Sequence, residues 1–215
     1  MTDLAPLYLA VVDGNAKAAR ALTETALAAG VDPQTIVTGQ LIPAMDEVGR
    51  RFEANEYFVP ELLISARSMK QCMALIKPLL VASGAKPVAK IAIGTVKGDL
   101  HDIGKNLVAA MLEGGGFEVV DLGVDVAPER FVAAVRDQQV TLLALSALLT
   151  TTMTAMRDTV RAFDAAGCRN KVKIMIGGAP ITQQFADEIG ADGYCDNASA
   201  AVTLARRLCG HSAAA

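Results

Sequence analysis

From about residue 88 onward, short apolar runs alternate with stretches of helical periodicity, and this alternation limits the possible folds most strongly. A strand, a helix and a second strand form the unit of a parallel sheet, because parallel neighbours need a crossover connection. We therefore predict a Rossmann-like (flavodoxin-like) domain whose five strands follow the order 2-1-3-4-5. The predicted strands are residues 88–94, 117–121, 142–146, 172–176 and 193–195. The predicted helices are residues 102–114, 128–138, 151–167, 181–189 and 197–209.

The first 82 residues repeat apolar side chains every three or four positions and contain almost no strand pattern. This spacing predicts a bundle of four or more helices, of which the longest runs from Val59 to about Leu80. Pro78 is expected to kink or end that helix. The predicted organisation is an α-helical cap (1–82), a linker with glycine and proline (83–88), and an α/β domain (89–215).

Composition and charge exclude several classes of protein. At 215 residues, 52% apolar and 20% charged, the chain can bury a core and is not disordered. A net charge of −3 without a basic stripe disfavours a nucleic-acid partner. The four cysteines form no C-x-x-C pair and the start lacks the pattern of a signal peptide. The longest apolar run, residues 140–149, is about half a membrane span. We expect a cytoplasmic protein with reduced thiols and no membrane association.

Three loops carry the residues best suited to a binding site. They follow the first, third and fourth predicted strands, at residues 95–104, 146–152 and 177–180. These strands are neighbours in the predicted order, so their carboxyl ends line one edge of the sheet, where open α/β folds bind ligands. The first loop contains Asp99 and, two residues later, His101. A carboxylate at this spacing can hold one imidazole nitrogen while the other nitrogen faces a metal.

Three short patterns in these loops occur in a recognisable order. They are D-x-H-x-x-G (Asp99, His101, Gly104), S-x-L (Ser146, Leu148) and G-G (Gly177, Gly178). Together they resemble the cobalamin-binding signature of vitamin B12-dependent methyl-transfer proteins. The resemblance covers nearly the whole chain, including residues 60–70 of the helical half. In this order of domains the chain is similar to the cobalamin module of methionine synthase and to the corrinoid proteins of methanol, methylamine and methoxyarene methyltransferases.

The resemblance implies a methyl carrier that does not turn over substrate alone. Its cofactor would be cobalamin, cycling between methylcobalamin and cob(I)alamin. A substrate-specific methyltransferase would load the cobalt. A second methyltransferase would deliver the methyl group to a thiol or a tetrahydrofolate-type acceptor. The implied partners also include a reductive activator.

The resemblance also assigns roles to individual residues. His101 would be the lower cobalt ligand, Asp99 would hold its other ring nitrogen, and Thr152 would continue the relay at a position where the family usually has serine. Ser146 and Thr150 would line the channel for the nucleotide tail of the cofactor. In the helical half, Phe52 and Val59 would cover the upper cobalt face, with the linker as a hinge. The cofactor-binding residues implied in the α/β domain are Gly98, Asp99, His101, Asp102, Ile103, Gly104, Ser146, Leu148, Thr150, Gly177 and Gly178.

Other interpretations remain open from the sequence. His101 alone could be a loop residue capping the next helix, and Asp102 is typical of a helix N-cap. A B12-dependent sensor or regulator shares the signature but needs a DNA-binding module. The small subunit of an adenosylcobalamin mutase commonly lacks the helical cap. A flavodoxin-like receiver or binding module without cobalamin leaves the cap and the three loops unexplained.

Overall fold

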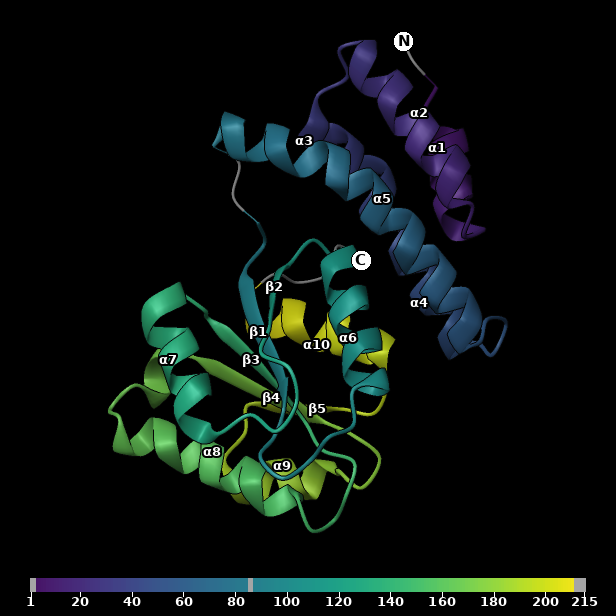
Figure 1. Cartoon of the computed structure of the whole chain (residues 1–215). Helices are drawn as coiled ribbons and strands as arrows, with labels where there is room; N and C mark the ends of the chain where they lie inside the picture. The colour runs from purple at the N-terminus through teal and green to yellow at the C-terminus, as the bar shows by residue number, and fades with distance from the viewer. Residues whose placement is uncertain (1–2, 85–86, 211–215) are drawn as a thin grey trace. The chain divides into compact units, whose positions relative to one another are not determined.

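The computed structural model describes residues 3–84 and 87–210, which divide into two compact units (Figure 1). Helices α1–α5 make up a helical unit, and five strands with helices α6–α10 make up a sheet unit. The short segment Glu113–Gly116 groups with the helical unit. Part of the predicted linker, residues 85–86, and the last predicted residues, 211–215, lie outside the described residues.

The helical unit is built as its apolar spacing predicts. Its elements are α1 (Ala5–Val12), α2 (Ala16–Ala28), α3 (Pro33–Ile36), the π-helical turn η1 (Val37–Leu41), α4 (Ile42–Glu53) and α5 (Val59–Ser83). The side chain of Asn15 caps α2 by accepting the amide hydrogen of Ala18. Asp32 caps α3 in the same way, with Pro33 as the first helical residue. Polar caps therefore mark where these helices begin.

Helix α5 organises the core of the helical unit. It packs against α2 and α4, and α1 contacts all three of these helices. Leu62, Met69 and Ile76, each seven residues apart, are buried along one stripe of α5. Pro78 was predicted to kink or end the helix, and it does not end it. The helix continues to Ser83 because the missing amide affects one bond only, and Gly84, with φ +74°, ends it in the left-handed conformation.

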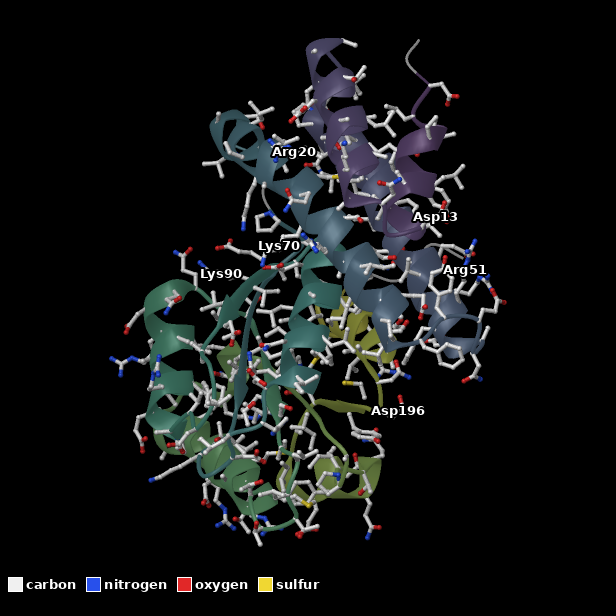
Figure 2. All side chains as sticks on the ribbon, turned by 45° about the vertical axis from the view of Figure 1, so that its right-hand side comes forward. Asp13, Arg20, Arg51, Lys70, Lys90 and Asp196 are labelled. Atoms are coloured by element: carbon white, nitrogen blue, oxygen red, sulfur yellow. The ribbon has the colours of Figure 1, made fainter. Side chains whose placement is uncertain are left out.

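A charged network joins the end of α4 to the turn before α5. Glu47 accepts hydrogen bonds from Arg50 Nε at 2.8 Å and from Arg51 Nε at 2.7 Å. Arg51, labelled in Figure 2, also donates to the Tyr57 hydroxyl at 2.9 Å and lies over its ring. The guanidinium groups of Arg50 and Arg51 lower the pKa of Glu47 to about 2. Glu47 therefore helps to fix the turn between Phe52 and Val59.

This network predicts an acid-dependent contribution to stability. Because the pKa of Glu47 is lower in the folded chain than its ordinary ~4.3, its carboxylate stabilises the fold above about pH 4.3. That contribution is lost as the pH falls towards about 2. Glu47→Gln should lower the urea midpoint of unfolding, measured by circular dichroism, at pH 7 but much less at pH 3. An equal difference at both pH values would contradict this assignment.

The sheet unit confirms the predicted topology. Strands β1 (Lys90–Thr95), β2 (Glu118–Asp121), β3 (Leu142–Ser146), β4 (Lys173–Gly177) and β5 (Gly193–Cys195) form one parallel sheet in the order β2-β1-β3-β4-β5. The helices are α6 (Ile103–Gly114), α7 (Pro128–Gln138), α8 (Met153–Ala165), α9 (Gln183–Ile189) and α10 (Ala198–Leu208), with a short 3-10 turn η2 (Arg169–Lys171). Helices α6 and α10 cover one face, and α7, α8 and α9 cover the other (Figure 1).

Phe131 of α7 belongs to the apolar core that α7 and α8 form with the sheet, and it is completely buried. Its ring lies directly against Gly94 of β1. A Cβ added at Gly94 would come within 2.9 Å of two ring carbons of Phe131. A side chain at position 94 would therefore force the ring, and with it α7, away from the sheet.

Gly94→Ala should lower the free energy of unfolding by about 1–3 kcal/mol through overpacking. The matched control is Gly104→Ala, because a Cβ at Gly104 meets nothing within 4 Å. The control should leave the free energy of unfolding unchanged or raise it slightly. Equal losses in the two variants, measured by urea denaturation of the cofactor-free chain, would contradict this packing argument.

Among the described residues, none of the helices combines the length and apolar character required to cross a bilayer.

Candidate functional site

The three predicted loops begin side by side. In the strand register, Thr95 at the end of β1 pairs with Ser146 at the end of β3. Ser146 in turn pairs with Gly177 at the end of β4. The segments that follow these three residues therefore leave the same edge of the sheet, as the strand order predicts.

His101, Asp99 and Thr152 form a continuous hydrogen-bonded relay. The distance from His101 Nδ1 to Asp99 Oδ1 is 2.7 Å. The Thr152 hydroxyl lies 2.7 Å from Asp99 Oδ2 and 2.9 Å from the Leu149 carbonyl, and the carboxylate is the stronger acceptor. Thr152 is thus placed to continue the relay, and its methyl group, which serine lacks, does not prevent the hydroxyl from reaching the Asp99 carboxylate.

Asp99 is 2% exposed, and its environment favours the ionised carboxylate. Burial by itself raises the pKa of Asp99. Hydrogen bonds from His101, Thr152 and the backbone amide of Leu148 outweigh burial and hold the pKa well below its ordinary range. The Leu148 amide donates to Oδ2 at 2.8 Å. Asp99 therefore joins the loop after β1 to the loop after β3 as an anion.

The ionised carboxylate determines which imidazole nitrogen is available. It can only accept, so Nδ1 of His101 carries the proton, and in the neutral imidazole Nε2 carries the lone pair. The Ser146 hydroxyl lies 2.8 Å from Nε2 and donates to it. The side chain of His101 is 14% exposed, so it sits at the surface of the site rather than in the core. A metal bound to Nε2 would replace the hydrogen bond from Ser146.

The main chain around His101 is also held. Thr95 is completely buried and its hydroxyl donates to the His101 carbonyl at 2.8 Å. Asp102 is exposed directly before α6, and its carbonyl accepts the amide hydrogen of Asn106 at 2.7 Å. Asp102 therefore stands at the N-cap position, as the simpler interpretation of this residue predicts.

Large apolar side chains are exposed on the loops that carry the relay and at the start of α6. They are Leu100 (74% exposed), Ile103 (79%), Leu148 (48%) and Leu149 (50%). Apolar surface grouped in this way is typical of a ligand-binding face. One imidazole is also the protein ligand expected for a metal that arrives inside a macrocycle. The residues at this edge of the sheet therefore fit a flat, metal-containing cofactor.

The predicted glycines differ in why they lack a side chain. At Gly104 a Cβ would enter open space, so the fold itself does not require glycine there. Gly178 has φ +129°, and a Cβ there would collide with the Ala147 carbonyl, so the fold requires glycine whether or not a ligand binds. Gly98 has φ +83° in the turn before Asp99. Gly177 is intermediate, because a Cβ would lie 3.0 Å from the Cys195 carbonyl oxygen.

Some predicted residues are not part of the relay. Thr150 is exposed in the loop after β3. Phe52 is half-buried in α4 and Val59 is 40% exposed at the start of α5, both in the helical unit. Thr95 and the exposed Leu100 and Leu149 were not among the site residues predicted from the sequence. Thr95 directly follows an apolar run at a strand end, which was a usable signal, but the exposure of the leucines depends on loop conformation.

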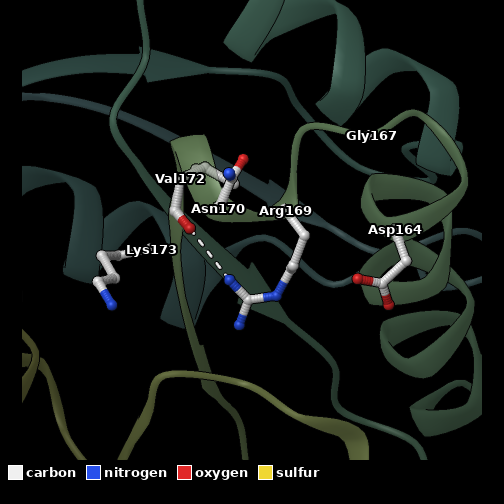
Figure 3. A pocket seen from close by; sticks show the side chains of 6 residues that line it. All are labelled: Asp164, Gly167, Arg169, Asn170, Val172 and Lys173. Atoms are coloured by element: carbon white, nitrogen blue, oxygen red, sulfur yellow. Dashed lines mark hydrogen bonds between the residues drawn. The ribbon is translucent and has the colours of Figure 1, made fainter.

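A separate depression of about 400 Å³ opens beside the amino end of β4 (Figure 3). It is lined by Asp164, Gly167, Arg169, Asn170, Val172 and Lys173, none of which was predicted to bind the cofactor. Arg169 donates to the Val172 carbonyl at 3.1 Å, and both Arg169 and Lys173 form ion pairs with Asp192. The positive charges of this depression are therefore already paired within the fold.

A parallel sheet with an imidazole–carboxylate pair at its carboxyl edge, surrounded by exposed apolar side chains, suits proteins that bind a macrocyclic metal cofactor. Comparison with protein families identifies the class. A family described as B12 binding domain matches residues 89–203, and a second family of the same description matches residues 4–77. The chain belongs to the B12-binding family of corrinoid proteins, and its cofactor is a corrinoid.

Individual relatives cover nearly the whole chain. Trimethylamine corrinoid protein 1 of Methanosarcina acetivorans is 41% identical over 93% of this chain and 93% of its own length. The crystal structure of a cobalamin-binding protein from Desulfitobacterium hafniense has a TM-score of 0.80 at 34% identity, covering 97% of this chain and 99% of its own. The methanol:cobalamin methyltransferase complex of Methanosarcina barkeri contains a chain with a TM-score of 0.85 at 30% identity, covering 96% and 79%. The predicted family is therefore confirmed.

The relay predicts different outcomes for two substitutions at position 152. Thr152→Val keeps the shape but removes the hydroxyl from the buried Asp99 carboxylate, which should lower the free energy of unfolding by about 1–3 kcal/mol. Thr152→Ser keeps the hydroxyl and should cost much less. Urea denaturation of the cofactor-free variants measures both values. Equal stability of Thr152→Val and wild type would show that the hydroxyl does not hold the carboxylate.

Proposed function

We propose that this protein carries a methyl group on the cobalt of a bound corrinoid, between a methyltransferase that supplies the group and one that accepts it. The observation that carries the proposal is the imidazole of His101. Asp99 holds its Nδ1 at 2.7 Å, which leaves Nε2 as the nitrogen that can ligate cobalt. The names of two relatives, a trimethylamine corrinoid protein and a chain of a methanol:cobalamin methyltransferase complex, support a methyl-transfer role.

The cofactor supplies the reactive chemistry, because corrinoid cobalt can accept and release a methyl group. The chain supplies the lower ligand and its orientation. His101 would hold the cobalt through Nε2, while Asp99 and Thr152 fix the ring and its tautomer. A cobalt held at Nε2 would take the place of the Ser146 hydroxyl, which now lies 2.8 Å from this nitrogen. Ser146 would then be free to contact the nucleotide tail of the cofactor.

The remaining site residues bind the cofactor by shape. The exposed side chains of Ile103 and Leu148 would offer an apolar surface to the corrin ring. Gly104 lets the ligand approach the start of α6, since beyond its own chain neighbours and the backbone of its helix no atom lies within 4 Å of the position its Cβ would take. The other residues proposed to contact the cofactor, chiefly its nucleotide tail, are Gly98, Asp102, Thr150, Gly177 and Gly178.

The helical unit is proposed to protect the upper face of the cofactor. Phe52 and Val59 stand at the two ends of the turn that the Glu47 network holds, and Val59 is 40% exposed. An apolar cover of this kind excludes water from a reactive group. In this proposal, residues 1–82 form the cap, residues 83–88 act as the hinge, and residues 89–215 hold the cofactor.

The proposed partners follow from the chemistry. A substrate-specific methyltransferase supplies the methyl group, and the names of the relatives favour methylated amines or methanol as its source. A second methyltransferase passes the group to a thiol or a tetrahydrofolate-type acceptor. A reductive activator is needed because reduced cobalt is readily oxidised.

Reconstitution with cobalamin tests the proposal directly. The wild-type chain should bind cobalamin in a 1:1 complex whose visible absorption spectrum differs from that of free cobalamin. His101→Ala should change that spectrum because it removes the lower ligand. The matched control is His211→Ala, which replaces the chain's other histidine and should behave as wild type. A wild-type chain that binds no cobalamin, or a His101→Ala spectrum identical to wild type, would contradict the proposal.

A further inference from the structure

The segment after β2, residues 122–126, runs alongside the loop that carries the proposed cobalt ligand. The Thr95 amide donates to the Gly123 carbonyl at 3.0 Å, and the Val126 amide donates to the Thr95 carbonyl at 2.9 Å. An isolated parallel bridge joins Val96 to Val126. The pairing of β1 with β2 therefore continues past the ends of both strands.

Asp125 closes this pairing with two hydrogen bonds that bracket one peptide unit. Its carboxylate accepts the Gly98 amide hydrogen at 2.7 Å. Its own amide donates to the Asp99 carbonyl at 3.0 Å. The main chain on both sides of Asp99 is thus tied to a single residue of the neighbouring loop. No role was predicted for Asp125 from the sequence.

The backbone of Asp125 shows that this arrangement is imposed by its surroundings. Its φ is +52°, and it is one of the non-glycine residues with positive φ in the described ranges, together with Asn55 and Gln139. This conformation costs free energy for a residue with a Cβ, although aspartate tolerates it better than most. Asp125 is also exposed, so packing in the core does not explain its conformation. Strain of this kind persists where several contacts hold it in place.

We propose that Asp125 is a positioning residue that holds the loop from Gly98 to His101 in the conformation that presents Nε2 to cobalt. This inference rests on the proposed function. The side chain of Asp99 can orient the imidazole only if the main chain of Asp99 is itself fixed. The Asp99 amide donates to the Val96 carbonyl within the same loop. Asp125, which lies outside this loop, holds its main chain through the hydrogen bonds to Gly98 and Asp99.

Substitution by glycine separates this role from a general effect on stability. Asp125→Gly removes the acceptor for the Gly98 amide but relieves the positive φ, so the unfolding midpoint should not fall. The dissociation constant for hydroxocobalamin should nevertheless rise about 10- to 100-fold, as for other groups that orient a metal ligand. Asp125→Asn keeps an acceptor oxygen and tolerates positive φ, so it should recover most of the affinity. Gln139→Gly relieves a φ of +58° at the end of α7 and is the matched control, with affinity as in wild type.

Amide hydrogen exchange of the cofactor-free chain gives a second readout. In Asp125→Gly the Gly98 amide should exchange about tenfold faster or more, while the amides of β3 remain protected. Loss of affinity and of Gly98 protection in Asp125→Gly, with recovery in Asp125→Asn, supports the inference. Wild-type affinity in Asp125→Gly overturns it and leaves the methyl-carrier proposal intact. If His101→Ala binds hydroxocobalamin with the same affinity and the same spectrum as the wild type, both proposals fail.

Discussion

The carboxylate of Asp99 is the interaction on which the rest of the site depends. It is 2% exposed, yet it accepts hydrogen bonds from the imidazole of His101, the hydroxyl of Thr152 and the amide of Leu148. A buried anion is tolerated only when its oxygens are satisfied in this way. Because these donors come from loops after β1 and β3, the buried carboxylate stays stably ionised only when the two loops are correctly placed.

The parallel sheet makes this convergence possible. The register aligns Thr95, Ser146 and Gly177, so the chain leaves three neighbouring strands at one edge. Apolar packing supports the same edge, because the Phe131 ring fills the space beside Gly94, the residue that precedes Thr95 in β1. The site residues themselves are polar or exposed, which is expected for groups placed to bind a ligand rather than to stabilise a core.

Much of this organisation could be predicted from the sequence, because strand–helix alternation and the D-x-H-x-x-G spacing depend on local patterns. The strand order and the pairing of His101 with Asp99 follow directly from them. Other features depend on contacts between distant residues. The need for glycine at position 178 arises from the carbonyl of Ala147, and the role of Asp125 arises from its approach to Gly98. Neither contact leaves a pattern in one sequence.

The helical unit shows the same division between local and distant information. Its capped starts at Asn15 and Asp32 are local signals, and helices begin there. The sequence predicted that α5 reaches about Leu80, and it left open whether Pro78 kinks or ends the helix. The helix runs on to Ser83 because a missing amide near the end of a long, well-packed helix removes only one hydrogen bond. The network of Glu47 and Arg51 with Tyr57 likewise became visible only once α4 and the following turn were placed together.

In the methyl-carrier proposal, a histidine nitrogen of this chain ligates cobalt in place of the base carried by the cofactor's own nucleotide tail. Electron paramagnetic resonance of the cob(II)alamin-loaded protein tests it, because one axial nitrogen-14 nucleus splits each cobalt line into three. Protein labelled with nitrogen-15 in its histidines and loaded with unlabelled cobalamin should instead show splitting into two. Threefold splitting that persists in the labelled protein would show that the cofactor's base remains bound, and would contradict the account.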